Sequence, residues 1–345
     1  MLPFQNSSMM NIGNLEVECL LSKGEERTQV YCPPGVVTFE PSQLPNSFPH
    51  LQQLFLAGVY PSNNRTRLKF PCDQNPLLLP LNLSHFQFDS KEIHALASYQ
   101  FVRTLSVTFT NRLRDITNLC PFTGSLQTIS FMNNDLQFMP FNCFTPKKNE
   151  SSELEFLDLS NNGLEYLKNN TFKRLTSLRM LYIANCQLKS LPVGLFDDLV
   201  HLKVLDLDRN NITFLQKGIF SKLVDLERLY MHNNSIQHIE YQSLPTYSDN
   251  LAFIDLRWNN LRTVPYDCLT LPNLYLCDCK GNKIRLNNLT EIIEHFDPIR
   301  MQLIKLYGHS YTSNRLGTLH EVVQSTIDLS DNKISGIDYS HAWPK

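Results

Sequence analysis

The stretch from Leu154 to Pro272 repeats one pattern of residue types at a nearly constant interval, and it constrains the fold more than any other feature of the chain. Three copies begin at Leu154, Leu178 and Leu202 and each spans 24 residues, and looser copies follow. One copy is too short to bury its own apolar side chains, whereas stacked copies bury a continuous core. The pattern therefore predicts a solenoid.

Each of these three copies places apolar residues at positions 1, 4, 6, 11 and 14 and phenylalanine at position 19, and position 9 is asparagine in two of them and cysteine in the second. In the first copy, Leu157 and Leu159 hold positions 4 and 6, Asn162 holds position 9 and Phe172 holds position 19. Positions 4 and 6 predict a short strand, because alternate side chains of a strand point to one face. The asparagine amide is suited to backbone groups that the following turn leaves unpaired.

This arrangement resembles the leucine-rich repeat, whose pattern is L-x-x-L-x-L-x-x-N/C-x-L. The resemblance implies an α/β solenoid, a horseshoe with parallel strands on the concave face and an irregular, 3-10 or short helical convex side. Copies in the same phase begin at Leu51, Leu78, Val102, Leu126, Leu154, Leu178, Leu202, Leu226, Leu251, Leu274, Met301 and Gln324. We therefore expect an array of about twelve repeats over residues 51–345, after an N-terminal cap region at residues 1–50.

The two ends of the sequence give a further expectation. The first residues, MLPFQNSSMMNIGN, have neither the basic nor the apolar region of a signal peptide, and no run of 18 apolar residues occurs. The sequence ends at Lys345 inside the twelfth copy. We expect either an intracellular protein or a C-terminally incomplete part of a longer secreted chain.

Charge and motifs favour no catalytic chemistry. The formal net charge of −2 gives no global attraction for nucleic acid. We find no P-loop, G-x-S-x-G or H-E-x-x-H motif. Cys277 and Cys279 have a spacing that also occurs in metal sites and redox pairs, but they hold inward positions 4 and 6, which favours a structural role. We predict a non-enzymatic chain with no cofactor and no metal.

Eight N-x-S/T sequons are present, and glycans on them would mark solvent-facing surface if the chain is secreted. They begin at Asn6, Asn64, Asn82, Asn149, Asn169, Asn211, Asn233 and Asn288.

The chain has nine cysteines, and several hold positions that the repeat explains as core. Cys120 and Cys143 hold nearly the same position in adjacent copies, so they either pair or remain two reduced core thiols. Cys186 replaces the asparagine at position 9, and Cys268, Cys277 and Cys279 are interpreted as buried structural residues. Extracellular repeat arrays usually carry a disulfide-linked cap ahead of the first repeat, which implies a Cys19–Cys32 disulfide if the chain is secreted.

The outward positions 3, 5, 7 and 8 are where binding is expected, because the inward positions are occupied by the core. Aromatic residues and arginine are the side chains that most often anchor protein interfaces. We therefore predict a protein-binding strip formed by Tyr182, Arg209, Arg228, Tyr230, Arg257 and Trp258. The alternative is that these side chains only pair across strands, aspartate with arginine and tyrosine with tyrosine.

The regular repeats, the sequons and the long array with irregular early copies resemble the ectodomain of a Toll or Toll-like receptor. That resemblance implies a cell-surface receptor that binds a microbial product or a cystine-knot cytokine on its concave or lateral surface, dimerises and signals through a TIR domain. A membrane would then be reached only through a C-terminal segment beyond this sequence. Two alternatives stay open: another extracellular repeat protein of adhesion, guidance or matrix binding, and an intracellular repeat scaffold.

Overall fold

The structure is a computed structural model of the chain, and it describes main chain and side chains within residues 103–284. The gaps in this range are 109–112, 118–119, 121–125, 141–142, 145–151, 246–247 and 272, and residues 269–270 are described by backbone alone. Outside the range only the backbone of individual strands is described. The chain forms two compact units, Met1–Cys186 and Gln187–Lys345, which are described separately below.

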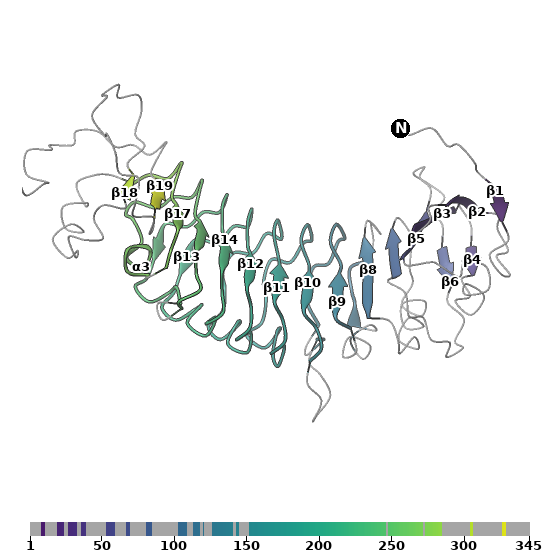
Figure 1. Cartoon of the computed structure of the whole chain (residues 1–345), viewed down its shortest axis with the longest axis horizontal. Coiled ribbons are helices and arrows are strands. Elements are labelled where there is room, and N and C mark those ends of the chain that lie inside the picture. Colours follow the sequence, from purple (N-terminus) through teal and green to yellow (C-terminus); the bar gives the residue numbers. More distant parts are fainter. Residues whose placement is uncertain are drawn as a thin grey trace, which may run out of the picture. The chain divides into compact units, whose positions relative to one another are not determined.

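The first unit is a ladder of strands that lie in chain order (Figure 1). β1, β2 and β3 pair antiparallel, and β3, β5, β7, β8, β9, β10 and β11 follow as parallel neighbours. β4 and β6 form a separate parallel pair. The strands are β1 (Ser8–Met10), β2 (Cys19–Lys23), β3 (Arg27–Cys32), β4 (Val36–Thr38), β5 (Gln53–Gly58), β6 (Arg67–Lys69), β7 (Leu81–Ser84), β8 (Thr104–Thr108), β9 (Thr128–Ser130), β10 (Phe156–Asp158) and β11 (Met180–Tyr182).

The second unit continues the same design. β12, β14, β16, β17, β19 and β18 are parallel neighbours in that order, and β13 pairs with β15 in a second short sheet. α3 is the one helix that the structure gives in the described part of this unit. The elements are β12 (Val204–Asp206), β13 (Phe214–Leu215), β14 (Arg228–Tyr230), β15 (His238–Ile239), β16 (Phe253–Asp255), α3 (Tyr266–Thr270), β17 (Leu276–Asp278), β18 (Ile304–Lys305) and β19 (Thr326–Asp328).

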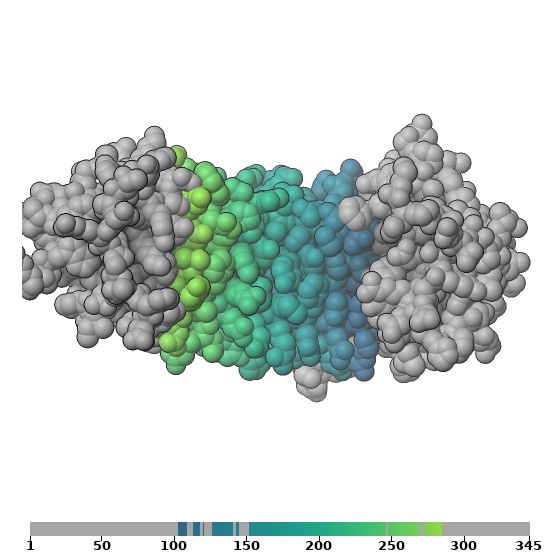
Figure 2. Space-filling view, turned by 45° about the horizontal axis from the view of Figure 1, so that its top comes forward, coloured from purple at the N-terminus to yellow at the C-terminus, as the bar shows by residue number. Residues whose placement is uncertain are grey.

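Equivalent positions of successive copies lie side by side, which confirms the predicted parallel-strand solenoid. Within the second unit, Val204 pairs with Arg228 and Arg228 with Phe253, all at position 3. Within each unit, Figure 2 shows the described copies as adjacent bands of colour. Because the register never shifts, each position of the repeat forms a column along its unit.

The inward columns form the predicted core. Leu205 and Leu207, at positions 4 and 6, are fully buried, as is Phe220 at position 19. The phenylalanine column continues from copy to copy, and the rings of Phe196 and Phe220 stack with centroids 5.6 Å apart. Burial of such side chains is the main favourable contribution to folding, and the array obtains it only because each copy covers the next.

Asparagine at position 9 joins each copy to the one before it. The amide of Asn162 donates to the carbonyls of Phe131 (2.9 Å) and Leu159 (2.8 Å), and its oxygen accepts the N–H of Leu136 at 3.0 Å. Four further asparagines repeat this arrangement with minor differences: Asn210, Asn234, Asn259 and Asn282. The predicted role of this column in satisfying turn backbone groups is confirmed.

Cys186 is the exception in this column. Its Sγ donates to the carbonyl of Leu159 at 3.2 Å, as an asparagine amide would. A thiol has no amide oxygen with which to accept a backbone N–H strongly. Cysteine therefore supplies only the donor half of the asparagine function at this position.

The other cysteines give one confirmation and one correction. Cys120 and Cys143 form a disulfide, which decides between the two alternatives left open by the sequence. Cys268 and Cys277 are buried as predicted, but the interpretation as separate core cysteines was wrong, because they also form a disulfide. One lies on α3 and the other on β17, and both point into the same interior with Cα atoms 6.1 Å apart.

The predicted Cys19–Cys32 disulfide remains a prediction, because these two side chains lie outside the described part. Cys19 begins β2 and Cys32 ends β3, and the two strands are antiparallel, so the residues occupy the same end of a hairpin. The cap at residues 1–50 and the repeats after residue 284 are likewise predictions.

Candidate functional site

The outward columns form a continuous surface on each unit, which we call the strand face. Positions 3 and 5 of a strand are partly exposed while the residue between them is buried, as Val204, Leu205 and Asp206 show on β12. The turn that follows carries positions 7 and 8 onto the same surface. The sequence prediction of which columns point outward is therefore confirmed for the described strands, except at position 5 of β16, where Asp255 is buried.

Five of the six predicted binding residues come together on the second unit. Arg228 and Tyr230 lie on β14, while Arg209, Arg257 and Trp258 lie in the turns after β12 and β16. Arg209, Arg228 and Trp258 are exposed, and half of the Trp258 surface is open to solvent. The sixth residue, Tyr182, lies on β11 of the first unit.

Cross-strand contacts occupy part of this set, as the alternative interpretation predicted. Tyr182 packs against Phe156, and Tyr230 packs against Phe253, each with ring centroids 5.4 Å apart. The partner is phenylalanine at position 3, and not the tyrosine that the sequence suggested. A tyrosine at position 5 lies directly opposite an aspartate on the next strand, as Tyr230 lies opposite Asp255. Phe253, two residues before Asp255, is therefore the diagonal neighbour of the Tyr230 ring.

The aspartates at position 5 have a structural role that sequence reasoning missed. Oδ1 of Asp158 accepts the N–H of Ser160 at 2.9 Å, and Oδ1 of Asp206 accepts the N–H of Asp208 at 2.9 Å. Asp255 and Asp278 bond to the residue two places later in the same way. An aspartate that accepts from the residue two places on is a common device for starting a turn. The signal was present in the sequence as an aspartate directly before the turn.

Position 8 adopts a left-handed backbone in all seven described copies from Leu126 onward. Most of these copies carry asparagine or glycine, the residues that adopt this conformation with least strain. Arg209 (φ 54°) and Trp258 (φ 55°) are the two bulky exceptions. The column consists of Asn133, Asn161, Asn185, Arg209, Asn233, Trp258 and Gly281.

Trp258 lies directly over the next residue of the same column. A Cβ atom added to Gly281 would stand 2.5 Å from Cε3 of Trp258, and Gly281 itself has a φ of +70°. Glycine at position 281 therefore allows the indole to lie flat on the following turn. This close approach fixes the exposed ring against the strand face.

Gly281→Ala is expected to destabilise the chain by about 1–3 kcal/mol, since it adds left-handed strain and a clash with the indole. It should also shift the fluorescence emission of Trp258, measured in a Trp343→Phe background. Gly218→Ala is the matched control, because Gly218 has a φ of +80° but its nearest atom, Oγ of Ser221, is 3.8 Å away. Equal losses of stability and unchanged emission in both variants would contradict the contact.

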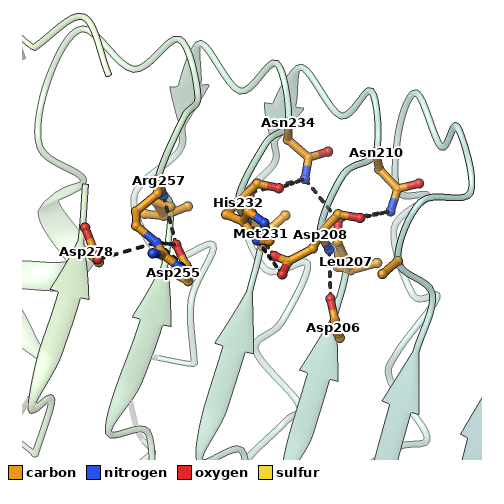
Figure 3. A network of polar contacts seen from close by, with 12 residues as sticks. Asp206, Leu207, Asp208, Asn210, Met231, His232, Asn234, Asp255, Arg257 and Asp278 are labelled. Carbon is orange, nitrogen blue, oxygen red and sulfur yellow. Dashed lines mark hydrogen bonds and ion pairs between the residues drawn. The ribbon is translucent and has the colours of Figure 1, made fainter. Parts of the chain in front are cut away.

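A group of charged side chains occupies positions 5 and 7 of the second unit (Figure 3). Arg257 donates from Nε and Nη2 to the two oxygens of Asp255, at 2.9 Å and 2.6 Å, and lies 3.5 Å from Asp278. These hydrogen bonds raise the pKa of Arg257 above its ordinary value. Asp255 is almost completely buried and Arg257 reaches outward from it, so the guanidinium forms the solvent side of the pair.

Asp208 and His232 form a second pair in the same columns. Oδ1 of Asp208 accepts the backbone N–H of His232 at 2.7 Å, and Oδ2 lies against Nδ1 of the imidazole. Burial, followed by the nearby charge of Asp206, raises the pKa of Asp208 to about 7. Burial is also the largest cause that lowers the pKa of His232. Burial is the main cause of both pKa shifts, because it disfavours the charged form of either group.

Three of the eight sequons lie in the described part, at Asn169, Asn211 and Asn233, and all three asparagines are exposed. Asn233 follows β14 at position 8, so a glycan there would border the strand face. The side chains of the other five sequon asparagines lie outside the described residues. In the described part of the chain, no helix combines the length and apolar character that crossing a membrane requires.

Comparison with protein families matches the sequence of these copies to a known repeat. Two models described as Leucine rich repeat match, one at residues 153–175 and the other at residues 179–236 and 200–261. The fold is a leucine-rich repeat solenoid. The matched residues carry the asparagine column and the strand face of both units.

The leucine-rich repeats of this chain are also similar to repeats in longer proteins. An adenylate cyclase of Podospora anserina is 30% identical over 128 residues, which cover 35% of this chain and 6% of that protein. The structure of the TLR13–ssRNA13 complex aligns with a TM-score of 0.52 and 25% identity, over 72% of this chain and 35% of that chain. The chain thus spans about a third of that receptor chain and far less of the cyclase.

A third similarity covers most of the compared protein. The FLRT2 leucine-rich repeat chain, in an octameric complex with Latrophilin 3 and Unc5D, aligns with a TM-score of 0.59. The identity is 21%, over 81% of this chain and 84% of that chain. At that identity the similarity establishes the fold alone.

Proposed function

We propose that this chain is a non-catalytic recognition module, and that it binds a protein through the strand face of its second unit. The observation that carries the proposal is the position-8 column. Arg209 and Trp258 stand where the other described copies have asparagine or glycine, and both are exposed. A conformation that disfavours bulky side chains persists at functional sites because the side chain is needed there.

The composition of the surface around these two residues supports a protein partner. Arginine, tryptophan and tyrosine are enriched among residues that dominate interface energetics. Trp258 is held flat by Gly281, and Arg257 is held by Asp255, so both side chains lose little freedom when a partner binds. Arg209 and Arg228 complete a surface that offers several donors around one large aromatic ring.

We further propose that the parent protein is a Toll-like cell-surface receptor and that the partner is a protein or microbial ligand. The 24-residue copies, the number of sequons and the 25% identity to TLR13 support this assignment. Dimerisation of the receptor and an extracellular location belong to the same proposal. A TIR domain encoded downstream of Lys345 in the full-length transcript is the expected finding.

A second function is suggested by how much of another repeat chain this chain aligns with. The chain aligns over 84% of the FLRT2 repeat chain, and the fold that the two share also fits an extracellular protein of adhesion, guidance or matrix binding. Immunoglobulin or fibronectin modules encoded downstream of Lys345 would favour this function over the Toll-like receptor.

Binding of a protein partner is expected to fall at least tenfold in Trp258→Ala and in Arg228→Ala, because the partner loses an anchoring side chain in each case. The partner would be identified by screening the full chain against secreted and cell-surface proteins, and affinities measured by surface plasmon resonance. Tyr166→Ala and Tyr275→Ala are controls, since both tyrosines are exposed but lie at positions 13 and 2, off the strand face. Loss of binding in the controls alone would place the site elsewhere.

A further inference from the structure

Charges on the strand face of the second unit are arranged in two layers. Arg209 and Arg228 are exposed, and the Arg257 side chain is 40% exposed. The carboxylates of Asp208, Asp255 and Asp278 lie beneath, since their side chains are only 13%, 2% and 14% exposed, whereas Asp206 is partly exposed. A partner therefore meets guanidinium groups first, although equal numbers of both signs lie nearby.

The Asp208–His232 pair has side-chain groups that the backbone hydrogen bond at this position does not require. In the first unit, Ser160 and Ala184 hold the same position 7 in successive copies, and Oγ of Ser160 accepts the N–H of Ala184 at 3.1 Å. Oδ1 of Asp208 makes the equivalent bond to the N–H of His232. A serine and an alanine are therefore enough to make this backbone hydrogen bond. The bond does not account for Oδ2 of Asp208 or for the imidazole of His232.

The geometry of these additional atoms points to a shared proton. Nδ1 of His232 is buried and has no aligned hydrogen-bond partner, although Oδ2 of Asp208 lies against it. An imidazole and a carboxyl group placed together away from solvent hold a proton between them as the pH changes. Surface aspartate–histidine contacts lack this property because water screens both groups.

Charged and titratable groups surround the pair on four strands and their turns. Asp206 and Arg209 belong to the copy of β12, and Arg228 and Tyr230 lie on β14. Asp255 and Arg257 come from the copy of β16, with Asp278 and Lys280 beyond them on the copy of β17. Proton uptake by Asp208 removes one negative charge from beneath the arginines, so the surface becomes cationic as the solution is acidified.

We propose that Arg209, Arg228 and Arg257, with the Asp208–His232 pair beneath them, bind an acidic protein segment, and that proton uptake by the pair strengthens this binding. The inference rests on the proposed function of the strand face and adds to it the chemistry of the partner and its regulation. Acidic side chains of the partner complement the exposed guanidinium layer, and arginine is suited to bidentate bonds with carboxylates. Loss of one buried negative charge increases the attraction by about tenfold at separations near 10 Å.

The probe for this proposal is a fluorescent decapeptide of alternating aspartate and glycine, which stays ionised at pH 5.5. Its affinity for the full chain is expected to be about tenfold higher at pH 5.5 than at pH 8.0 by fluorescence anisotropy. The double variant Asp208→Ser/His232→Ala copies the Ser160–Ala184 arrangement, so it should fold normally and lose this pH dependence. Arg209→Ala/Arg228→Ala should lose binding at both pH values.

Three outcomes would overturn the proposal. One is tighter binding of a lysine–glycine decapeptide, and another is an unchanged pH dependence in the double variant. The third is preferential binding of a single-stranded oligothymidylate to the same arginines, which would indicate a nucleic acid partner. If Trp258→Ala abolishes binding of a protein partner while the aspartate peptide does not bind, the proposed function stands and only this inference fails.

Discussion

Asn162→Ala is expected to lower the free energy of unfolding by about 2–4 kcal/mol, because three buried backbone groups each lose a hydrogen bond, although one carbonyl keeps the amide of Asn134 and the other keeps the thiol of Cys186. Those groups are the carbonyls of Phe131 and Leu159 and the N–H of Leu136, which belong to two successive copies. The loss should appear in urea denaturation, and hydrogen exchange should place the weakened amides at this turn. The effect is large for an alanine substitution because the N–H of Leu136 is buried, and a buried polar group left without a partner is costly.

Cys186 supplies the matched comparison within the same column. Asn162→Cys should lose less stability than Asn162→Ala, because a thiol can still donate as Cys186 does to Leu159. Cys186→Asn should increase stability, since asparagine adds an oxygen that can accept the N–H of Leu164. Equal stability of Asn162→Ala and Asn162→Cys would show that the column does not act through its hydrogen bonds.

Asp208→Ser is expected to change how stability depends on pH. The pKa of Asp208 is about 7 in the folded chain against a reference of 3.8, so the folded state holds a proton that the unfolded state releases. Stability from this group is fully present below pH 3.8 and is lost as the pH rises to about 7. Relative to the unsubstituted chain, Asp208→Ser should therefore gain up to about 4 kcal/mol between pH 4 and pH 8.

His232 acts with the opposite sign, because its pKa is lowered and acidification below 6.5 favours the unfolded state. The two groups are in contact, so Asp208→Ser also changes the titration of His232, and comparing Asp208→Ser/His232→Ala with His232→Ala isolates the carboxyl group. Ser160→Asp is the reciprocal test, since it places a carboxyl group over Ala184 in the equivalent position. It should destabilise the chain more at pH 8 than at pH 4, and parallel pH profiles for all three proteins would refute the burial of Asp208.

The sequence was sufficient for those features of the fold that recur in every copy. Periodicity alone predicted the buried column of Leu205, the asparagine role of Asn162 and the outward position of Trp258. These predictions succeeded because a residue in a solenoid has the same neighbours, one repeat away, in each copy. The Cys120–Cys143 disulfide was one of two open alternatives for the same reason.

Features that depend on a contact particular to one copy were not predictable from the pattern. The Cys268–Cys277 disulfide joins α3 to the next strand, and no other described copy has a helix there. The Asp208–His232 pair requires knowledge that position 7 of one copy touches position 7 of the next. The left-handed backbone at position 8 could have been predicted, since asparagine recurs there. Arg209 and Trp258 interrupt the run of asparagines, and the pattern was therefore missed.

The most direct measurement of the central claim combines stability and partner binding in Arg209→Asn. Asparagine is the residue of this column in Asn161, Asn185 and Asn233, so the substitution should keep or slightly raise the midpoint of thermal unfolding. Binding of a protein partner should fall at least tenfold. Arg174→Asn is the control, because Arg174 has a φ of 63° but lies at position 21, away from the strand face. Unchanged binding in Arg209→Asn together with a lower midpoint would contradict the account, because the arginine would then serve the fold and not a partner.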